Sequence, residues 1–102
     1  MQTKSTVKTE IVARRRSFDN CTIIGWSDGA ITTGMWGYIA RKLPMEAVWF
    51  VMGEVENYEH KLGEVKALCE VARWMAKRGP IDIPRARVLV EEAINRAKQR
   101  AS

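Results

Sequence analysis

Residues 44–78 read PMEAVWFVMGEVENYEHKLGEVKALCEVARWMAKR, and this stretch carries the strongest pattern in the sequence. With Val48 at position a of a heptad, every a and d position is apolar or aromatic, which is typical of an amphipathic helix. These positions are Val48, Val51, Val55, Tyr58, Leu62, Val65, Cys69, Ala72 and Ala76. Pro44 is tolerated in the first turn of a helix, and Gly79 and Pro80 end the pattern. The stretch therefore predicts helical structure.

Two arrangements of this helical stretch remain open. A single helix over residues 44–78 would be about 52 Å long and would need a coiled-coil partner, whereas a break near residues 57–63 would let the chain fold back on itself. Residues 44–59 contain four Glu and no basic residue, and residues 60–79 have a net charge of +3. Antiparallel packing of these two halves is therefore favourable, either within one chain or in an antiparallel homodimer.

Shorter elements are predicted on either side. Residues 6–26 hold two β-rich runs around the turn-forming sequence Ser-Phe-Asp-Asn at 17–20, which predicts a β-hairpin. The alternative is a flexible basic arm followed by one strand. Over residues 30–43, Ile31, Met35, Ile39 and Leu43 recur every four residues, which predicts a helix although two glycines weaken it. A connector with two prolines then leads into a last helix over residues 85–100.

Together these elements predict a mainly α protein with a small N-terminal β element, in the α+β class. The chain has 102 residues, of which 46% are apolar and 28% are charged, so we expect one domain over residues 1–102. Its expected parts are a basic arm or β-hairpin at 1–26, a helix at 30–43, a long or broken amphipathic helix at 44–78 and a C-terminal helix at 85–100.

Several classes of protein are disfavoured by the sequence. The longest stretch without charge covers only residues 29–40, and a membrane-spanning helix needs about 20 apolar residues. The N-terminal residues hold no apolar run typical of a secretory signal. We therefore expect a cytoplasmic protein with no membrane partner.

Metal, cofactor and catalytic motifs are also missing from the sequence. Cys21 and Cys69 form no C-x-x-C pair, and His60 is the only histidine, so a zinc site is not expected. No phosphate-binding glycine motif or nucleophile motif occurs. His60 lies in a charged stretch, where we expect a solvated surface histidine. The sequence thus predicts neither an enzyme nor a cofactor.

Clusters of basic residues give the leading hypothesis for function. The net charge of +5 permits a polyanionic partner. Three clusters are suited to phosphate contacts with DNA or RNA. They are Arg14, Arg15 and Arg16; Lys77 and Arg78; and Arg85 and Arg87. Asp82 precedes the last cluster and is suited to capping the final helix. We therefore predict a non-catalytic, nucleic-acid-associated or regulatory protein.

The alternative hypothesis is a protein–protein interaction module, such as an inhibitor or an assembly subunit. Trp49 and Phe50 are adjacent and point about 100° apart on a helix, so at least one ring should lie outside the apolar seam. Trp74 also lies off the a and d positions. Together with Glu54 on the acidic helix face, these residues would form the interface with a partner protein.

Overall fold

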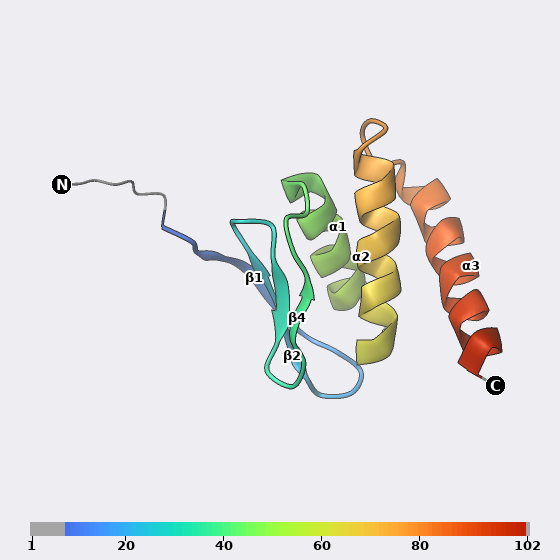
Figure 1. Ribbon diagram of the computed structural model, residues 1–102, viewed down its shortest axis with the longest axis horizontal. Coiled ribbons are helices and arrows are strands. Elements are labelled where there is room, and N and C mark those ends of the chain that lie inside the picture. Colours follow the sequence, from blue (N-terminus) through green and yellow to red (C-terminus); the bar gives the residue numbers. More distant parts are fainter. Residues whose placement is uncertain (1–7, 102) are drawn as a thin grey trace.

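The computed structural model describes residues 8–101, which form a four-stranded sheet followed by three helices (Figure 1). The strands are β1 (Ile11–Arg16), β2 (Thr22–Trp26), β3 (Ile31–Thr33) and β4 (Gly37–Ala40). The helices are α1 (Met45–Asn57), α2 (Leu62–Ala76) and α3 (Ile83–Ala101). The part of the predicted basic arm that precedes Lys8 lies outside the described residues.

The four strands form one antiparallel sheet in the order β1-β2-β3-β4. The first two strands make a hairpin where the sequence predicts one, with Arg14 opposite Ile24 and Arg16 opposite Thr22. The turn between them is tight, because the Ser17 N–H donates to Cys21 O at 2.9 Å and Asn20 adopts a φ of 65°. Asn tolerates this left-handed conformation better than most residues.

The predicted helix over residues 30–43 is wrong, because this segment forms the hairpin of β3 and β4. The four-residue spacing of apolar side chains arises here from two short strands, with Met35 exposed in the turn between them. Two adjacent threonines favour a strand, and Gly37 has a φ of 75° that suits a turn. The protein is therefore α+β with a substantial antiparallel sheet, and the prediction of a mainly α protein with a small β element is corrected.

The helical stretch at 44–78 breaks and folds back within one chain. α1 ends at Asn57, Tyr58 is extended, and α2 begins at Leu62 (Figure 1). The break is held from outside, since the Leu62 N–H donates to Asp19 Oδ2 at 2.9 Å and the Phe18 N–H donates to His60 O at 3.0 Å. The turn between β1 and β2 thus fixes the turn between the two helices.

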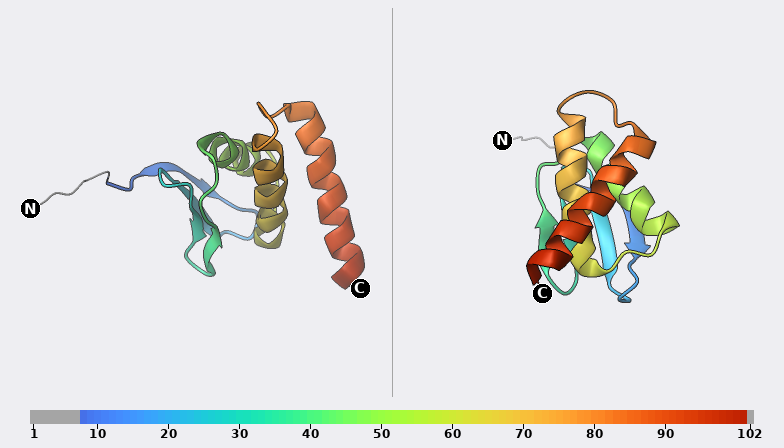
Figure 2. Two further views of the ribbon diagram at one scale, coloured as in Figure 1. Left: turned by 45° about the horizontal axis from the view of Figure 1, so that its top comes forward. Right: turned by 90° about the vertical axis from the view of Figure 1, so that its right-hand side faces the viewer.

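The elements stack in three layers, with the sheet first, α1 and α2 second, and α3 outermost (Figure 2). α1 packs on β1 and β2, α2 packs on α1 and β4, and α3 packs on α2. Seven of the nine predicted heptad positions are buried, namely Val48, Val51, Val55, Leu62, Val65, Cys69 and Ala72. Tyr58, at the break, is 46% exposed and Ala76 is only partly buried, so the prediction fails at these two positions. In contrast, no helix formed by residues 8–101 covers the other face of the sheet (Figure 2).

Candidate nucleic-acid interface

The uncovered face of the sheet is defined by strand alternation. Ile23 and Gly25 point toward α1, so their neighbours along β2 point to the opposite side. Cross-strand partners share a face of the sheet, which extends this side across all four strands. We call this surface the open face, and it consists of Ile11, Arg14, Arg16, Thr22, Ile24, Trp26, Thr32 and Tyr38.

The same alternation divides the arginine triplet of β1 between the two faces. Arg15 points toward α1, where its Nη2 lies 3.0 Å from Glu56 Oε1. Strand register places Arg14 and Arg16 on the open face, and both are exposed, although Arg16 also lines a hollow with the last turn of α1. Arg16 Nη1 also donates to Asn20 O at 3.1 Å, which holds the side chain near the turn. Two of the three predicted phosphate contacts thus lie on one surface, and the third is part of an ion pair.

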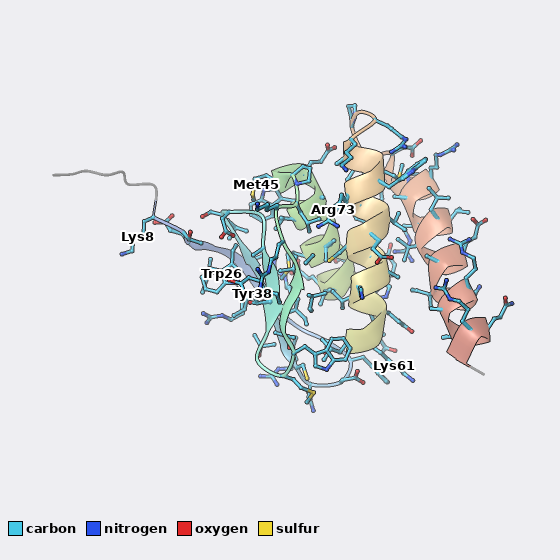
Figure 3. The ribbon with its side chains drawn as sticks, in the orientation of Figure 1. Lys8, Trp26, Tyr38, Met45, Lys61 and Arg73 are labelled. Carbon is cyan, nitrogen blue, oxygen red and sulfur yellow. The ribbon has the colours of Figure 1, made fainter. Side chains whose placement is uncertain are left out.

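Two aromatic side chains lie on the open face beside these arginines. Trp26 and Tyr38 both project from the side of the sheet that faces away from the helices (Figure 3). Trp26 Nε1 donates to Thr32 Oγ1 at 2.7 Å, which fixes the indole on the sheet. Tyr38 is 56% exposed, and the Arg41 guanidinium carbon lies 3.9 Å from its ring centroid. This pair was not predicted from the sequence, because the pattern over residues 30–43 favours a helix that would separate Tyr38 from Trp26.

The other predicted basic residues lie elsewhere. Lys77 and Arg78 follow the last residue of α2, whereas the turn after Arg16 contacts the first residue of that helix. Fifteen helical residues, or about 22 Å, separate the two ends. Arg78 stacks on Trp74 at 3.8 Å and donates to its carbonyl. The predicted basic clusters therefore do not form one continuous surface.

The start of α3 serves a structural purpose. Asp82 Oδ1 accepts a hydrogen bond from the Arg85 N–H at 3.4 Å, which is the capping role that the sequence suggests. Arg85 itself is exposed. Arg87 points inward, and its Nη1 lies 2.7 Å from both carboxylate oxygens of Glu54. The first turns of α3 thus offer only Arg85 as an exposed cation.

Glu54 and His60 are both buried, contrary to the solvated positions expected from the sequence. Glu54 is 5% exposed and His60 is 8% exposed. His60 Nε2 lies 3.3 Å from Glu54 Oε1, and its Nδ1 lies 3.5 Å from Glu64 Oε1. The Arg87 guanidinium also lies 3.4 Å from the centroid of the Tyr58 ring. The expectation failed because α3 crosses this end of α1 and brings a cation to it.

A cavity of about 400 Å³ adjoins this buried cluster between the helices. Its lining includes His60, Glu64, Arg87, Glu91 and Lys98. Three carboxylates, from Glu59, Glu64 and Glu91, line it together with the cations of Arg87 and Lys98, so both signs of charge are present. Within the described part of the chain, no three His, Cys, Asp or Glu side chains are placed to hold a metal ion.

The residues predicted for a protein interface are scattered. Phe50 is buried in the core and Glu54 is in the ion pair described above, so neither is available at the surface. Trp49 and Trp74 are 53% and 48% exposed, on α1 and α2 respectively. The prediction that one of the two adjacent rings at 49 and 50 lies outside the seam is confirmed, and it is Trp49.

Comparisons with known proteins identify no family and no function for this chain. No protein-family model, curated protein or solved structure matches this chain. Between residues 8 and 101, no helix is both long enough and apolar enough to cross a bilayer. The functional interpretation therefore rests on the geometry of the open face.

Proposed function

We propose that this protein binds nucleic acid through the open face of its sheet. The observation that supports this most directly is the presence of Arg14 and Arg16 on the same uncovered surface as Trp26 and Tyr38. Guanidinium groups pair with phosphate oxygens, and aromatic rings on a sheet stack with bases. A surface that combines both groups suits a polyanion that carries planar rings.

The distribution of charge favours this face over the helical side. Glu46, Glu54 and Glu56 belong to α1, which lies behind the sheet. Arg41 adds a third guanidinium at the edge of the open face through its contact with Tyr38. Asp28 lines the surface hollow that the aromatic pair also lines, and exposed Glu10 lies just before β1, where its N–H donates to Ser27 Oγ. The arginines therefore outnumber the acidic groups on the proposed binding surface.

A salt titration of labelled oligonucleotides tests the proposal. Single-stranded and duplex probes are titrated by fluorescence anisotropy at about 50 and 200 mM salt, a range over which several phosphate contacts change affinity by orders of magnitude. Replacing Arg14 and Arg16 together with Ala should weaken binding. On a single strand it should also flatten the slope of log K against log salt by about 1.4, or about 0.7 for each phosphate that is no longer neutralised.

The matched control removes the same charge from the other end of the molecule. The double variant Lys77→Ala, Arg85→Ala loses two exposed cations that lie away from the open face. It should retain the wild-type salt slope within error. Equal losses in both double variants would show a general effect of net charge, and no binding by the wild type at the lower salt would refute the proposal.

A further inference from the structure

The open face contains a hollow of about 290 Å³ beside its two aromatic rings. This volume is at the lower end of the range for small-ligand sites, roughly 300–1,000 Å³. The lining residues come from the segment just before β1, from β2 and β3 with the turn between them, and from β4. They are Thr9, Trp26, Asp28, Ala30, Thr32 and Tyr38.

The walls of this hollow are suited to a flat, uncharged ring. The indole of Trp26 is held by its hydrogen bond to Thr32, so its position is set before any ligand arrives. Tyr38 stands opposite Thr32 across the strand pair, and Arg41 covers part of its ring. Both aromatic rings and guanidinium planes are surfaces on which unpaired bases stack.

Asp28 gives the hollow a specific chemical requirement. Its Oδ1 accepts a hydrogen bond from the Ala30 N–H at 3.1 Å, which orients the carboxylate. Within residues 8–101, no hydrogen bond engages its Oδ2. Asp28 is exposed, and because an ionised carboxylate accepts hydrogen bonds and donates none, a ligand that pairs with it does so through N–H or O–H groups. The Thr32 hydroxyl already accepts from Trp26 and so has its own proton left to donate.

Building on the nucleic-acid function proposed above, we propose that this hollow binds one unpaired guanine of a single-stranded nucleic acid. Among the bases, guanine carries two adjacent N–H donors, N1–H and N2–H, on its Watson–Crick edge, and a carboxylate can accept from both. In a duplex that edge is already paired, so only a single strand can present it.

The arginines are placed to hold the backbone of the neighbouring nucleotides. Arg14 lies in the cross-strand row that also contains Ile24, Thr32 and Tyr38, so three strand spacings, or about 14 Å, separate it from the tyrosine. Arg16 is further along β1, away from Trp26. A strand that crosses the sheet can thus place a base in the hollow and its adjoining phosphates near both guanidinium groups.

A set of single-stranded probes that differ at one base tests this proposal. Each probe is an oligouridine of eight nucleotides with G, inosine, A or C at its centre, and binding is followed by anisotropy at about 50 mM salt. Inosine lacks the N2 amino group, so it removes one of the two donors. The wild type should bind the G probe roughly tenfold to hundredfold more tightly than the A probe, with inosine between them.

Asp28→Asn is the decisive variant, because Asn keeps an acceptor for the Ala30 N–H and nearly the same volume. It should lose the preference for G while its affinity for the A probe changes by no more than a few fold. Tyr38→Leu should weaken binding to all single-stranded probes. Trp49→Leu, which removes an equally exposed ring from α1, should change nothing.

The outcomes separate this proposal from the general function. Arginine-dependent binding that is equal for all four bases, or stronger for duplex, would refute the guanine site and leave the nucleic-acid function standing. Retention of the G preference by Asp28→Asn would also refute it. Absence of binding to every probe would refute both proposals. Thermal unfolding of each variant verifies that a loss of binding is not a loss of fold.

Discussion

Arg87 of α3 joins Glu54 of α1 through one nitrogen that lies 2.7 Å from both oxygens of a buried carboxylate. Thirty-three residues separate the two side chains in the sequence. This contact ties the outermost helix to the helix that lies against the sheet, in addition to the packing of α3 on α2.

Removal of the Arg87 cation, with Glu54 left in place, should lower the free energy of unfolding. Arg87→Leu leaves the Glu54 carboxylate buried without its ionic partner, and breaking a buried pair in this way typically costs about 3–5 kcal/mol. The Arg87 side chain is 28% exposed, so we expect about 3 kcal/mol in urea unfolding. The double variant Glu54→Leu, Arg87→Leu should be more stable than Arg87→Leu. Equal or lower stability of the double variant would contradict the ion-pair explanation.

Two glycines should respond in opposite directions to the same substitution. A Cβ at Gly25 would lie 2.9 Å from both Val48 Cγ1 and Met52 Cγ, so Gly25→Ala should overpack the sheet–helix contact and cost about 1–3 kcal/mol. Gly53 lies within α1 with no heavy atom within 4 Å of its built Cβ among the described residues. Gly53→Ala should therefore stabilise the protein by about 0.5–1 kcal/mol. Thermal and urea unfolding measure both, and a Gly25→Ala protein as stable as the wild type or more stable would contradict the packing described for β2.

The two cysteines should differ in reactivity. Burial raises the pKa of the Cys69 thiol from 9.0 to about 12, with Arg73 opposing the shift. The reactive species is the thiolate, so Cys69 should resist a thiol reagent at pH 8 in the folded protein. Half-buried Cys21 serves as the internal control and should react first. Rapid labelling of both thiols before unfolding would contradict the buried position of Cys69.

The same thiol should contribute to the pH dependence of stability. Because the folded protein holds this proton to a higher pH than the unfolded chain, the associated stability is present below about pH 9 and is lost as pH rises toward about 12. The free energy of unfolding should thus fall more steeply over this window in the wild type than in Cys69→Ala. If the plots of unfolding free energy against pH are parallel for the two proteins, Cys69 does not contribute to the pH dependence of stability.

The first turn of α2 should depend on Asp19, a residue of the turn between β1 and β2. The Leu62 N–H donates to Asp19 Oδ2 at 2.9 Å, which satisfies one donor at the helix start. Asp19→Ala should cost about 1 kcal/mol, as removal of a helix cap usually does. Asp19→Asn, which keeps an acceptor at this position, should lose less. If the unfolding midpoint of Asp19→Ala equals that of the wild type, water replaces the carboxylate without a loss of stability.

Local periodicity predicted most of the buried seam of the two central helices, but not the exposure of Tyr58 or the burial of Phe50, Met52 and Leu68 outside that seam. Val48, Val55, Leu62 and Cys69 are buried as the heptad requires, because helical spacing depends only on neighbouring residues. The break at Tyr58 was one of two arrangements that the charges allowed. The contacts that fix the break come from Asp19 and Phe18, and neither was visible in the local pattern.

Features that depend on distant partners could not be predicted in the same way. β3 has three residues and β4 has four, too few to show alternation against the four-residue spacing that suggested a helix. The open face emerges only when strand register places Tyr38 opposite Thr32 and Thr32 opposite Ile24. Likewise, Glu54 looks like a solvated acidic residue until α3 brings Arg87 to it.

The two faces of the sheet have different roles, one in the stability of the fold and the other in the proposed binding of a partner. On the side of α1, Ala13, Ile23 and Ile31 are fully or almost fully buried, so a change there alters the folding free energy. The open-face side chains Ile24, Thr32 and Tyr38 lie outside the buried core, so a change at these positions should leave the core intact. The surface that meets a partner is thus free to acquire new chemistry, one residue at a time, on a scaffold whose stability is set elsewhere.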